Sequence, residues 1–189
     1  GWGADGNDLA SLADPISVRF PGAAFFVPNG PTPCKTNPAG REWFDIDDRV
    51  NGPIIAAPII DQAITEALEV LNLSSSSLAL TGFSQGGMMS LHCGLRQTPP
   101  IAAIISFSGA LLIYDDLVEN MGEVLYPPVM LIHGTDDDVV PFQLQEASRD
   151  ILHGRSIEVE TIDCKGLGHG INPHGLSSAI EFLAKYLPA

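Results

Sequence analysis

Short apolar runs alternate along this chain with segments in which apolar residues recur about every 3.6 positions. Five runs have the length and residue types of strands: Ala23–Val27, Leu78–Gly82, Ile101–Phe107, Val129–His133 and Ile157–Asp163. Four segments have the spacing of helices: Pro53–Leu71, Gln85–Arg96, Phe142–Leu152 and Gly175–Leu187. This alternation predicts an α/β fold, with a mostly parallel sheet covered by helices on both faces. The second helical segment is apolar on nearly all sides, so we expect it to be the most buried helix.

Two connections between these elements are informative. Residues 28–52 contain four prolines and three glycines, which predicts a long irregular connection. Trp43 and Phe44 within it favour an ordered loop. Only about twenty residues, including Tyr114, Asp115 and Asp116, separate the third predicted strand from the fourth, so no large lid domain is expected.

Composition limits the class of protein. A chain of 189 residues, 45% of them hydrophobic, predicts one domain spanning residues 1–189. The net charge of −14 disfavours nucleic acid as a partner. With neither an apolar stretch of membrane-spanning length nor a signal-peptide pattern, we expect a soluble, cytoplasmic protein without integral membrane association. Cys34, Cys93 and Cys164 have no close pairing or metal-type spacing, which disfavours a disulfide framework.

The segment Gly82–Gly87, GFSQGG, lies between an apolar run and a helical pattern. A serine in a sharp strand-to-helix turn adopts a strained backbone, and we expect the glycines two before and two after it to prevent a Cβ clash with neighbouring chain. The Ser84 hydroxyl would then lie near a helix N-terminus, whose N–H groups favour a developing oxyanion. This context favours a nucleophilic serine over an ordinary glycine-rich turn.

A nucleophilic serine needs a base, and the base needs an orienting carboxylate. His169 lies among glycines after the last predicted strand, and its competitor is His174. Three adjacent acids follow the strand that ends at His133, and its carboxyl end should open on the same sheet edge as Ser84. Spacing alone does not choose among these acids, which are Asp136, Asp137 and Asp138.

With these motifs the sequence resembles the carboxylesterase/phospholipase family of α/β-hydrolases, which includes acyl-protein thioesterases and small bacterial carboxylesterases. The resemblance covers nearly the whole chain and rests on five segments: Gly1–Leu9, Trp43–Asp45, Gly82–Met88, His133–Pro141 and Gly168–His169. In the family's His-Gly-x-x-Asp-x-Val-Val-Pro pattern the catalytic acid is the fifth residue, here Asp137. The resemblance therefore implies that Ser84 is the nucleophile, His169 the base and Asp137 the orienting acid.

The same resemblance implies an oxyanion hole made by the backbone N–H groups of Trp2 and Gln85. It also implies substrate contacts from Trp43 and Met88, although core packing is nearly as well supported for Trp43. No metal or organic cofactor is expected.

Family members carry an apolar strand ending in His before the residue that matches Gly1, and the sequence lacks this strand. We therefore expect an N-terminally incomplete hydrolase domain. If Gly1 were the true start, Trp2 would be poorly anchored, and the unpaired strand edges beside the gap would be candidates for pairing in a homodimer.

The predicted function is hydrolysis of small-molecule, short- to medium-chain carboxylic esters through an acyl-enzyme intermediate. Thioester or lysophospholipid hydrolysis by the same triad is one alternative. A non-catalytic binding protein with a hydrolase fold is the alternative from another class.

Overall fold

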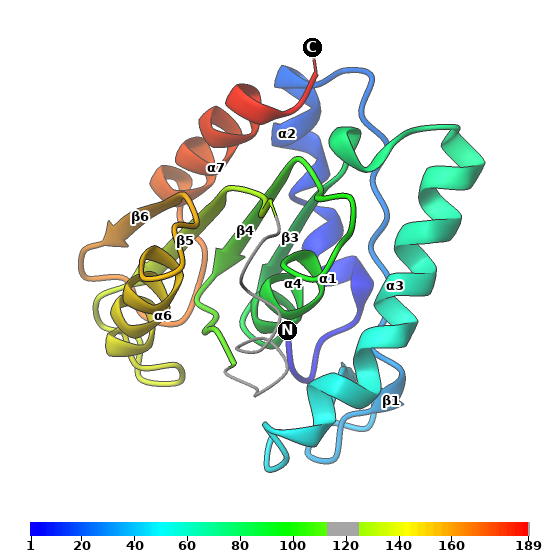
Figure 1. Ribbon diagram of the computed structural model, residues 1–189. Helices are drawn as coiled ribbons and strands as arrows, with labels where there is room; N and C mark the ends of the chain where they lie inside the picture. Colours follow the sequence, from blue (N-terminus) through cyan, green and yellow to red (C-terminus); the bar gives the residue numbers. More distant parts are fainter. Residues whose placement is uncertain (113–124, 189) are drawn as a thin grey trace.

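The computed structural model describes residues 1–112 and 125–188. In this part of the chain, four strands form a parallel sheet in the order β3-β4-β5-β6 (Figure 1). The strands are β3 Ala79–Phe83, β4 Ala103–Phe107, β5 Val129–Gly134 and β6 Val159–Cys164. Phe83 pairs with Phe107, which pairs in turn with Ile132. The carboxyl ends of the strands therefore lie together at one edge of the sheet.

Helices cover both faces of this sheet (Figure 1). The longer ones are α3 Asn51–Leu71, α4 Gln85–Gly94, α6 Gln143–His153 and α7 Pro173–Tyr186, and the shorter α2 spans Ala13–Arg19. Ile105 of β4 packs in one apolar cluster with Phe182 of α7, and the preceding Ile104 packs in another with Leu91 of α4. Successive residues of the buried strand thus serve opposite layers, as the two-residue period of a strand requires. The fold is that of an α/β-hydrolase.

The helix α4 lies at the centre of one layer. All of its residues except Gly86 are buried, which confirms the expectation of a helix enclosed on nearly all sides. The helix α3 packs Ile60 and Ile64 against Met89 and Cys93 of α4. The position of Ser84 at the start of α4 is therefore set by packing on both sides of that helix.

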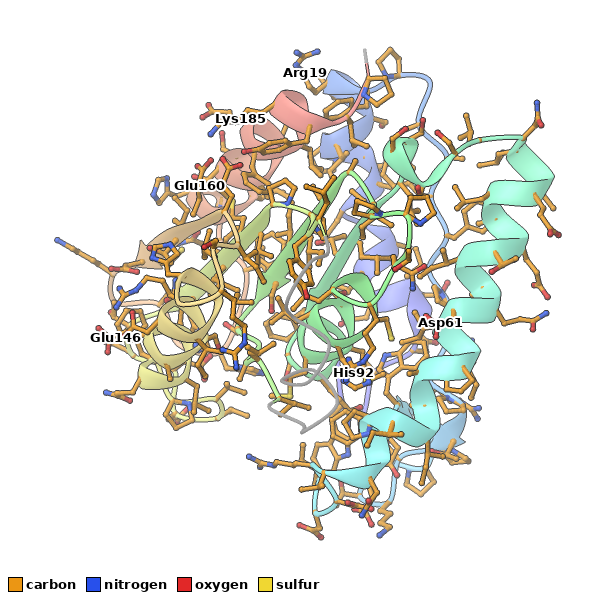
Figure 2. All side chains as sticks on the ribbon, in the orientation of Figure 1. Arg19, Asp61, His92, Glu146, Glu160 and Lys185 are labelled. Atoms are coloured by element: carbon orange, nitrogen blue, oxygen red, sulfur yellow. The ribbon has the colours of Figure 1, made fainter. Side chains whose placement is uncertain are left out.

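An exposed ion pair joins α7 to the edge strand β6. Lys185 Nζ donates to Glu160 Oε1 at 2.6 Å (Figure 2). Exposed pairs contribute about 0–1 kcal/mol, so the fully buried Phe182 does more to hold α7 on the sheet.

The predicted strand Ala23–Val27 is wrong. These residues are exposed and pair with no strand of the described chain. A strand requires backbone hydrogen bonds to a neighbouring strand, and an apolar run does not by itself supply the neighbour. Two short helices, α1 (Gly6–Ala10) and α2, were not predicted because they lack a long apolar period; Ile16 is the one buried residue of α2.

The connection over residues 28–52 is largely irregular, as expected. It contains a two-residue antiparallel pair, β1 (Thr32–Pro33) and β2 (Arg41–Glu42), and α3 begins at Asn51. The absence of a large lid domain was predicted from the connection between β4 and β5. Residues 113–124 of that connection, including Tyr114, Asp115 and Asp116, lie outside the described residues.

Candidate active site

Ser84 occupies the turn between β3 and α4. Its backbone has φ 55° and ψ −121°, a conformation that side chains rarely adopt, and its N–H donates to the Phe107 carbonyl at 2.8 Å. An added Cβ at Gly82 would lie 2.2 Å from the Gly86 carbonyl oxygen, so the turn requires a glycine there. The expectation for Gly86 itself is wrong, because a Cβ at that position would have nothing within 4 Å; the second crowded glycine is Gly87.

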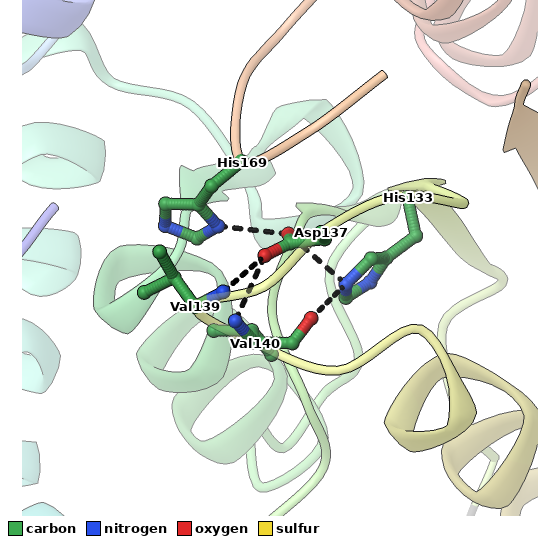
Figure 3. A network of polar contacts seen from close by, with 5 residues as sticks. All are labelled: His133, Asp137, Val139, Val140 and His169. Atoms are coloured by element: carbon green, nitrogen blue, oxygen red, sulfur yellow. Dashed lines mark hydrogen bonds and ion pairs between the residues drawn. The ribbon is translucent and has the colours of Figure 1, made fainter. Parts of the chain in front are cut away.

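Asp137 and His169 are paired at the same edge of the sheet (Figure 3). His169 Nδ1 lies 2.8 Å from Asp137 Oδ2. The other carboxylate oxygen, Oδ1, accepts the backbone N–H groups of Val139 at 3.0 Å and Val140 at 2.8 Å. Because an ionised carboxylate only accepts, Nδ1 carries the proton and Nε2 of the neutral imidazole keeps a lone pair.

Burial separates the three adjacent acids. Asp137 is buried, whereas Asp136 and Asp138 are exposed. Burial raises the pKa of the Asp137 carboxyl, but hydrogen bonds from His169 and two backbone N–H groups outweigh it, so its pKa lies below the ordinary value. The carboxylate is therefore ionised at neutral pH. The competing histidine, His174, is exposed on α7 and does not line the cavity around Ser84.

A second histidine, His133, also lies close to the Asp137 carboxylate. His133 Nε2 lies 2.7 Å from the Val140 carbonyl oxygen and 3.3 Å from Asp137 Oδ2 (Figure 3). A carbonyl only accepts, so Nε2 is the protonated nitrogen. Sequence reasoning missed this contact, because the loop after β5 has to fold back before His133 and Asp137 meet. Their spacing of four residues in the family motif is the signal that could have found it.

Ser84 and His169 line one cavity of about 380 Å³. In the described chain Ser84 Oγ and His169 form no hydrogen bond with each other, an arrangement common in unliganded sites that tighten around substrate. Two charged residues, Asp8 and Arg49, line the cavity beside a larger apolar set of Ile46, Phe83, Met88, Val139, Val140, Pro141 and Leu144. Of the two predicted substrate contacts, Met88 lines the cavity, and Trp43 packs outside it against the cluster around Phe44.

Two residues that line the cavity have backbone N–H groups without an acceptor among the described residues. Gln85 is the first residue of α4, so its N–H has no acceptor within the helix. Trp2 lines the same cavity as Ser84. Among the hydrogen bonds of residues 1–112 and 125–188, none uses the backbone N–H of either residue. Both groups match the oxyanion donors predicted from the family resemblance.

Poor anchoring of Trp2 was expected for a chain that starts at Gly1, but in the structure hydrogen bonds hold this segment. The Gly3 N–H donates to the Arg41 carbonyl at 2.9 Å, and the Arg41 N–H donates to the Ala4 carbonyl at 2.9 Å. The Trp2 indole Nε1–H donates to Glu42 Oε2 at 2.8 Å. The anchor comes from β2, about forty residues away in sequence, which is why local patterns did not reveal it.

Within the described ranges, no cluster of His, Cys, Asp and Glu side chains is arranged to hold a metal ion. In the same ranges, no helix combines the length and the apolar character that a membrane crossing demands.

The chain order of Ser84, Asp137 and His169 at the carboxyl edge of a parallel sheet is that of the α/β-hydrolases. Residues 1–187 match the phospholipase/carboxylesterase family, and the chain belongs to that family. It is a hydrolase of the carboxylesterase and thioesterase type.

Individual relatives agree with this placement. The crystal structure of esterase PE8 has a TM-score of 0.91 and 38% identity, over 99% of this chain and 89% of that chain. Acyl-protein thioesterase 1 homolog 1 from Dictyostelium discoideum is 30% identical over all of this chain and 88% of its own length. Esterase YpfH from Escherichia coli (strain K12) is 27% identical over 95% of this chain and 77% of its own.

Proposed function

We propose that the protein is a serine carboxylesterase that hydrolyses short- to medium-chain carboxylic esters through an acyl-enzyme intermediate. The observation that carries the proposal is the hydrogen bond of 2.8 Å between His169 Nδ1 and the buried Asp137 carboxylate. It leaves the lone pair of Nε2 free to accept the proton of Ser84, which lines the same cavity.

The reaction has two acyl-transfer steps. Ser84 Oγ attacks the ester carbonyl while His169 Nε2 takes its proton, and the N–H groups of Trp2 and Gln85 stabilise the oxyanion. The tetrahedral intermediate collapses to an acyl-Ser84 ester, and His169 gives its proton to the departing alcohol. Water then attacks the acyl group with His169 again as base, which releases the acid and restores the serine.

The cavity supports a modest acyl chain. Its volume of about 380 Å³ is near the small end of the range of small-molecule sites, about 300–1,000 Å³. Its apolar rim includes the exposed side chains of Val139 and Leu144. The apolar part of the wall favours an aliphatic group, because apolar area removed from water contributes about 25 cal/mol per Å².

Thioester hydrolysis is the second candidate, because the Dictyostelium relative is named an acyl-protein thioesterase. Lysophospholipid hydrolysis would use the same groups. We expect p-nitrophenyl butyrate and octanoate to be turned over faster than p-nitrophenyl palmitate. A matched panel of an ester, a thioester and a lysophospholipid with one acyl chain then ranks the three chemistries.

The decisive variant is Ser84→Ala. We expect it to lower kcat for p-nitrophenyl butyrate by at least about 10³-fold and to abolish labelling by a fluorophosphonate probe. Ser90→Ala is the matched control, because Ser90 lies in α4, its hydroxyl bonds to the Gly86 carbonyl and it does not line the cavity. Retained hydrolysis by Ser84→Ala would refute the assignment of Ser84 as the nucleophile. An unreactive wild-type protein would favour a hydrolase-fold binding protein.

A further inference from the structure

Glu42 is a buried carboxylate with an unusual partner. It is 5% exposed, and its Oε2 accepts the indole N–H of Trp2 at 2.8 Å. Among the described residues it forms no ion pair; the cation near it, Lys35, is paired with Asp45. Burial of a carboxylate is unfavourable without strong compensation, so this contact has to be held firmly by the surrounding structure.

The backbone around Glu42 supplies that support. The preceding residue, Arg41, exchanges backbone hydrogen bonds with both Gly3 and Ala4. The Glu42 carbonyl accepts the Thr32 hydroxyl at 3.3 Å. Gly3 and Ala4 are therefore fixed to β2 by backbone contacts, and the indole–carboxylate bond fixes the Trp2 side chain to the same strand.

The next two residues hold the other oxyanion donor. The Trp43 N–H donates to Gln85 Oε1 at 2.8 Å, and Gln85 Nε2 donates to the Phe44 carbonyl at 2.7 Å. Gln85 is 1% exposed, so its bond to Phe44 is buried and its bond to Trp43 is partly buried. The residue that presents one free backbone N–H is thus tied by its own side chain to residues 43 and 44.

We infer that residues 41–44 form a clamp that sets the spacing of the two oxyanion donors, with Glu42 as the positioning residue for Trp2. This inference rests on the proposed function, since it assigns the clamp a role in ester hydrolysis. Glu42 does not line the cavity, so it acts through Trp2 and not on the substrate. Oxyanion donors work only when they are already aimed at the position that the oxyanion will occupy.

Loosening the clamp should therefore affect the transition state more than substrate binding. We expect Glu42→Leu, which removes the acceptor, to lower kcat by about 10- to 100-fold and to change KM by less than about threefold. Glu42→Gln keeps an amide oxygen as acceptor and should retain kcat within about threefold. Trp2→Phe removes the indole donor and should lose as much kcat as Glu42→Leu. The double variant Trp2→Phe/Glu42→Leu should lose no more than the worse single variant.

Three readouts separate the clamp from a general structural role. The inhibition constant of a trifluoromethyl ketone, which forms an oxyanion at Ser84, should rise in parallel with the loss of kcat. Glu66→Leu, at an exposed glutamate of α3, controls for the removal of one negative charge and should leave kcat and KM unchanged. Thermal unfolding of each variant shows whether it is folded. If Glu42→Leu does not fold, Trp2→Phe and Glu42→Gln test the same hydrogen bond.

The results that would contradict the clamp differ from those that would contradict the proposed esterase function. Three outcomes would overturn the clamp proposal without affecting the proposed esterase activity. The first is wild-type kcat in folded Glu42→Leu and Trp2→Phe. The others are kcat losses that add in the double variant, or a kcat loss in Glu42→Gln equal to that in Glu42→Leu. Absence of wild-type turnover, or full turnover by Ser84→Ala, would overturn the esterase itself.

Discussion

The Asp137 carboxylate accepts three hydrogen bonds although it is buried, and His133 lies close to it. His169 and His133 approach one oxygen, and the N–H groups of Val139 and Val140 donate to the other. A side chain with this many donors is held in one rotamer, and the imidazole bonded to it is held in one tautomer. Neither exposed neighbour, Asp136 or Asp138, has an equivalent environment.

The lowered pKa of Asp137 predicts a pH-dependent contribution to stability. A carboxyl whose pKa is lower in the folded state stabilises the fold above its unfolded pKa, and this contribution is lost as pH falls through the folded pKa. Urea unfolding of wild type and Asp137→Asn should therefore differ most at neutral pH, and the difference should shrink as pH falls below about 4. Asp138→Asn should differ from wild type by less than about 0.5 kcal/mol throughout. A wild-type minus Asp137→Asn difference that is constant with pH would contradict this account.

The sharp turn at Ser84 is formed by β3 and α4, whose backbones are in direct contact. Gly82 faces the Gly86 carbonyl, and α4 is in turn held against the sheet and α3. Because the strained Ser84 conformation is maintained by this packing, a shift of either element displaces both the nucleophile and the Gln85 N–H.

Two alanine substitutions test the close approach. In Gly82→Ala the new Cβ meets the backbone of Gly86 and Gly87 within 2.6 Å, so β3 and α4 have to separate. We expect destabilisation by about 1–3 kcal/mol and a loss of kcat/KM greater than about tenfold. Gly86→Ala places its Cβ in open space and should stay within about twofold of wild type in kcat/KM. Equal effects of the two substitutions in unfolding and kinetic assays would be incompatible with the structure.

At the scale of the whole molecule, the three cysteines lie in separate parts of the fold. Cys34 belongs to the 28–52 connection, Cys93 to α4 and Cys164 to the end of β6, and all three are buried and free. Burial, with a smaller contribution from nearby Asp61, raises the pKa of the Cys93 thiol to about 12. Their reactivity therefore reports on opening of the molecule at three different places.

Thiol labelling measures this enclosure. The thiolate is the reactive form, and a thiol of pKa about 12 is ionised to roughly one part in ten thousand at pH 8. With an aromatic disulfide reagent at pH 8, the native protein should release little chromophore over minutes, and the unfolded protein should release three equivalents. Mass spectrometry after brief alkylation should find Cys93 unmodified in the native state. Fast native labelling at Cys93 would mean that α4 is not enclosed.

Much of the fold was predictable from sequence because its signals are local. Apolar periodicity located β3 to β6 and the helices α3, α4, α6 and α7, with boundaries shifted by one to a few residues. The sharp turn at Ser84 was predictable because a strand, a glycine-flanked serine and a helix follow one another directly. Ala23–Val27 failed as a strand because pairing depends on a neighbour that local sequence does not specify.

The sequence therefore sufficed to determine the fold class, the family and the three residues expected to act together. Spacing alone could not choose Asp137 from its neighbours; in the structure, the folding back of the loop after β5 makes that carboxylate the buried partner of His169. Only the tertiary structure revealed the hydrogen bonds of Glu42 to Trp2 and of Gln85 to residues 43 and 44. It also showed that Gly82, and not Gly86, has no room for a Cβ. These contacts link residues about forty positions apart, so only the packed chain defines them.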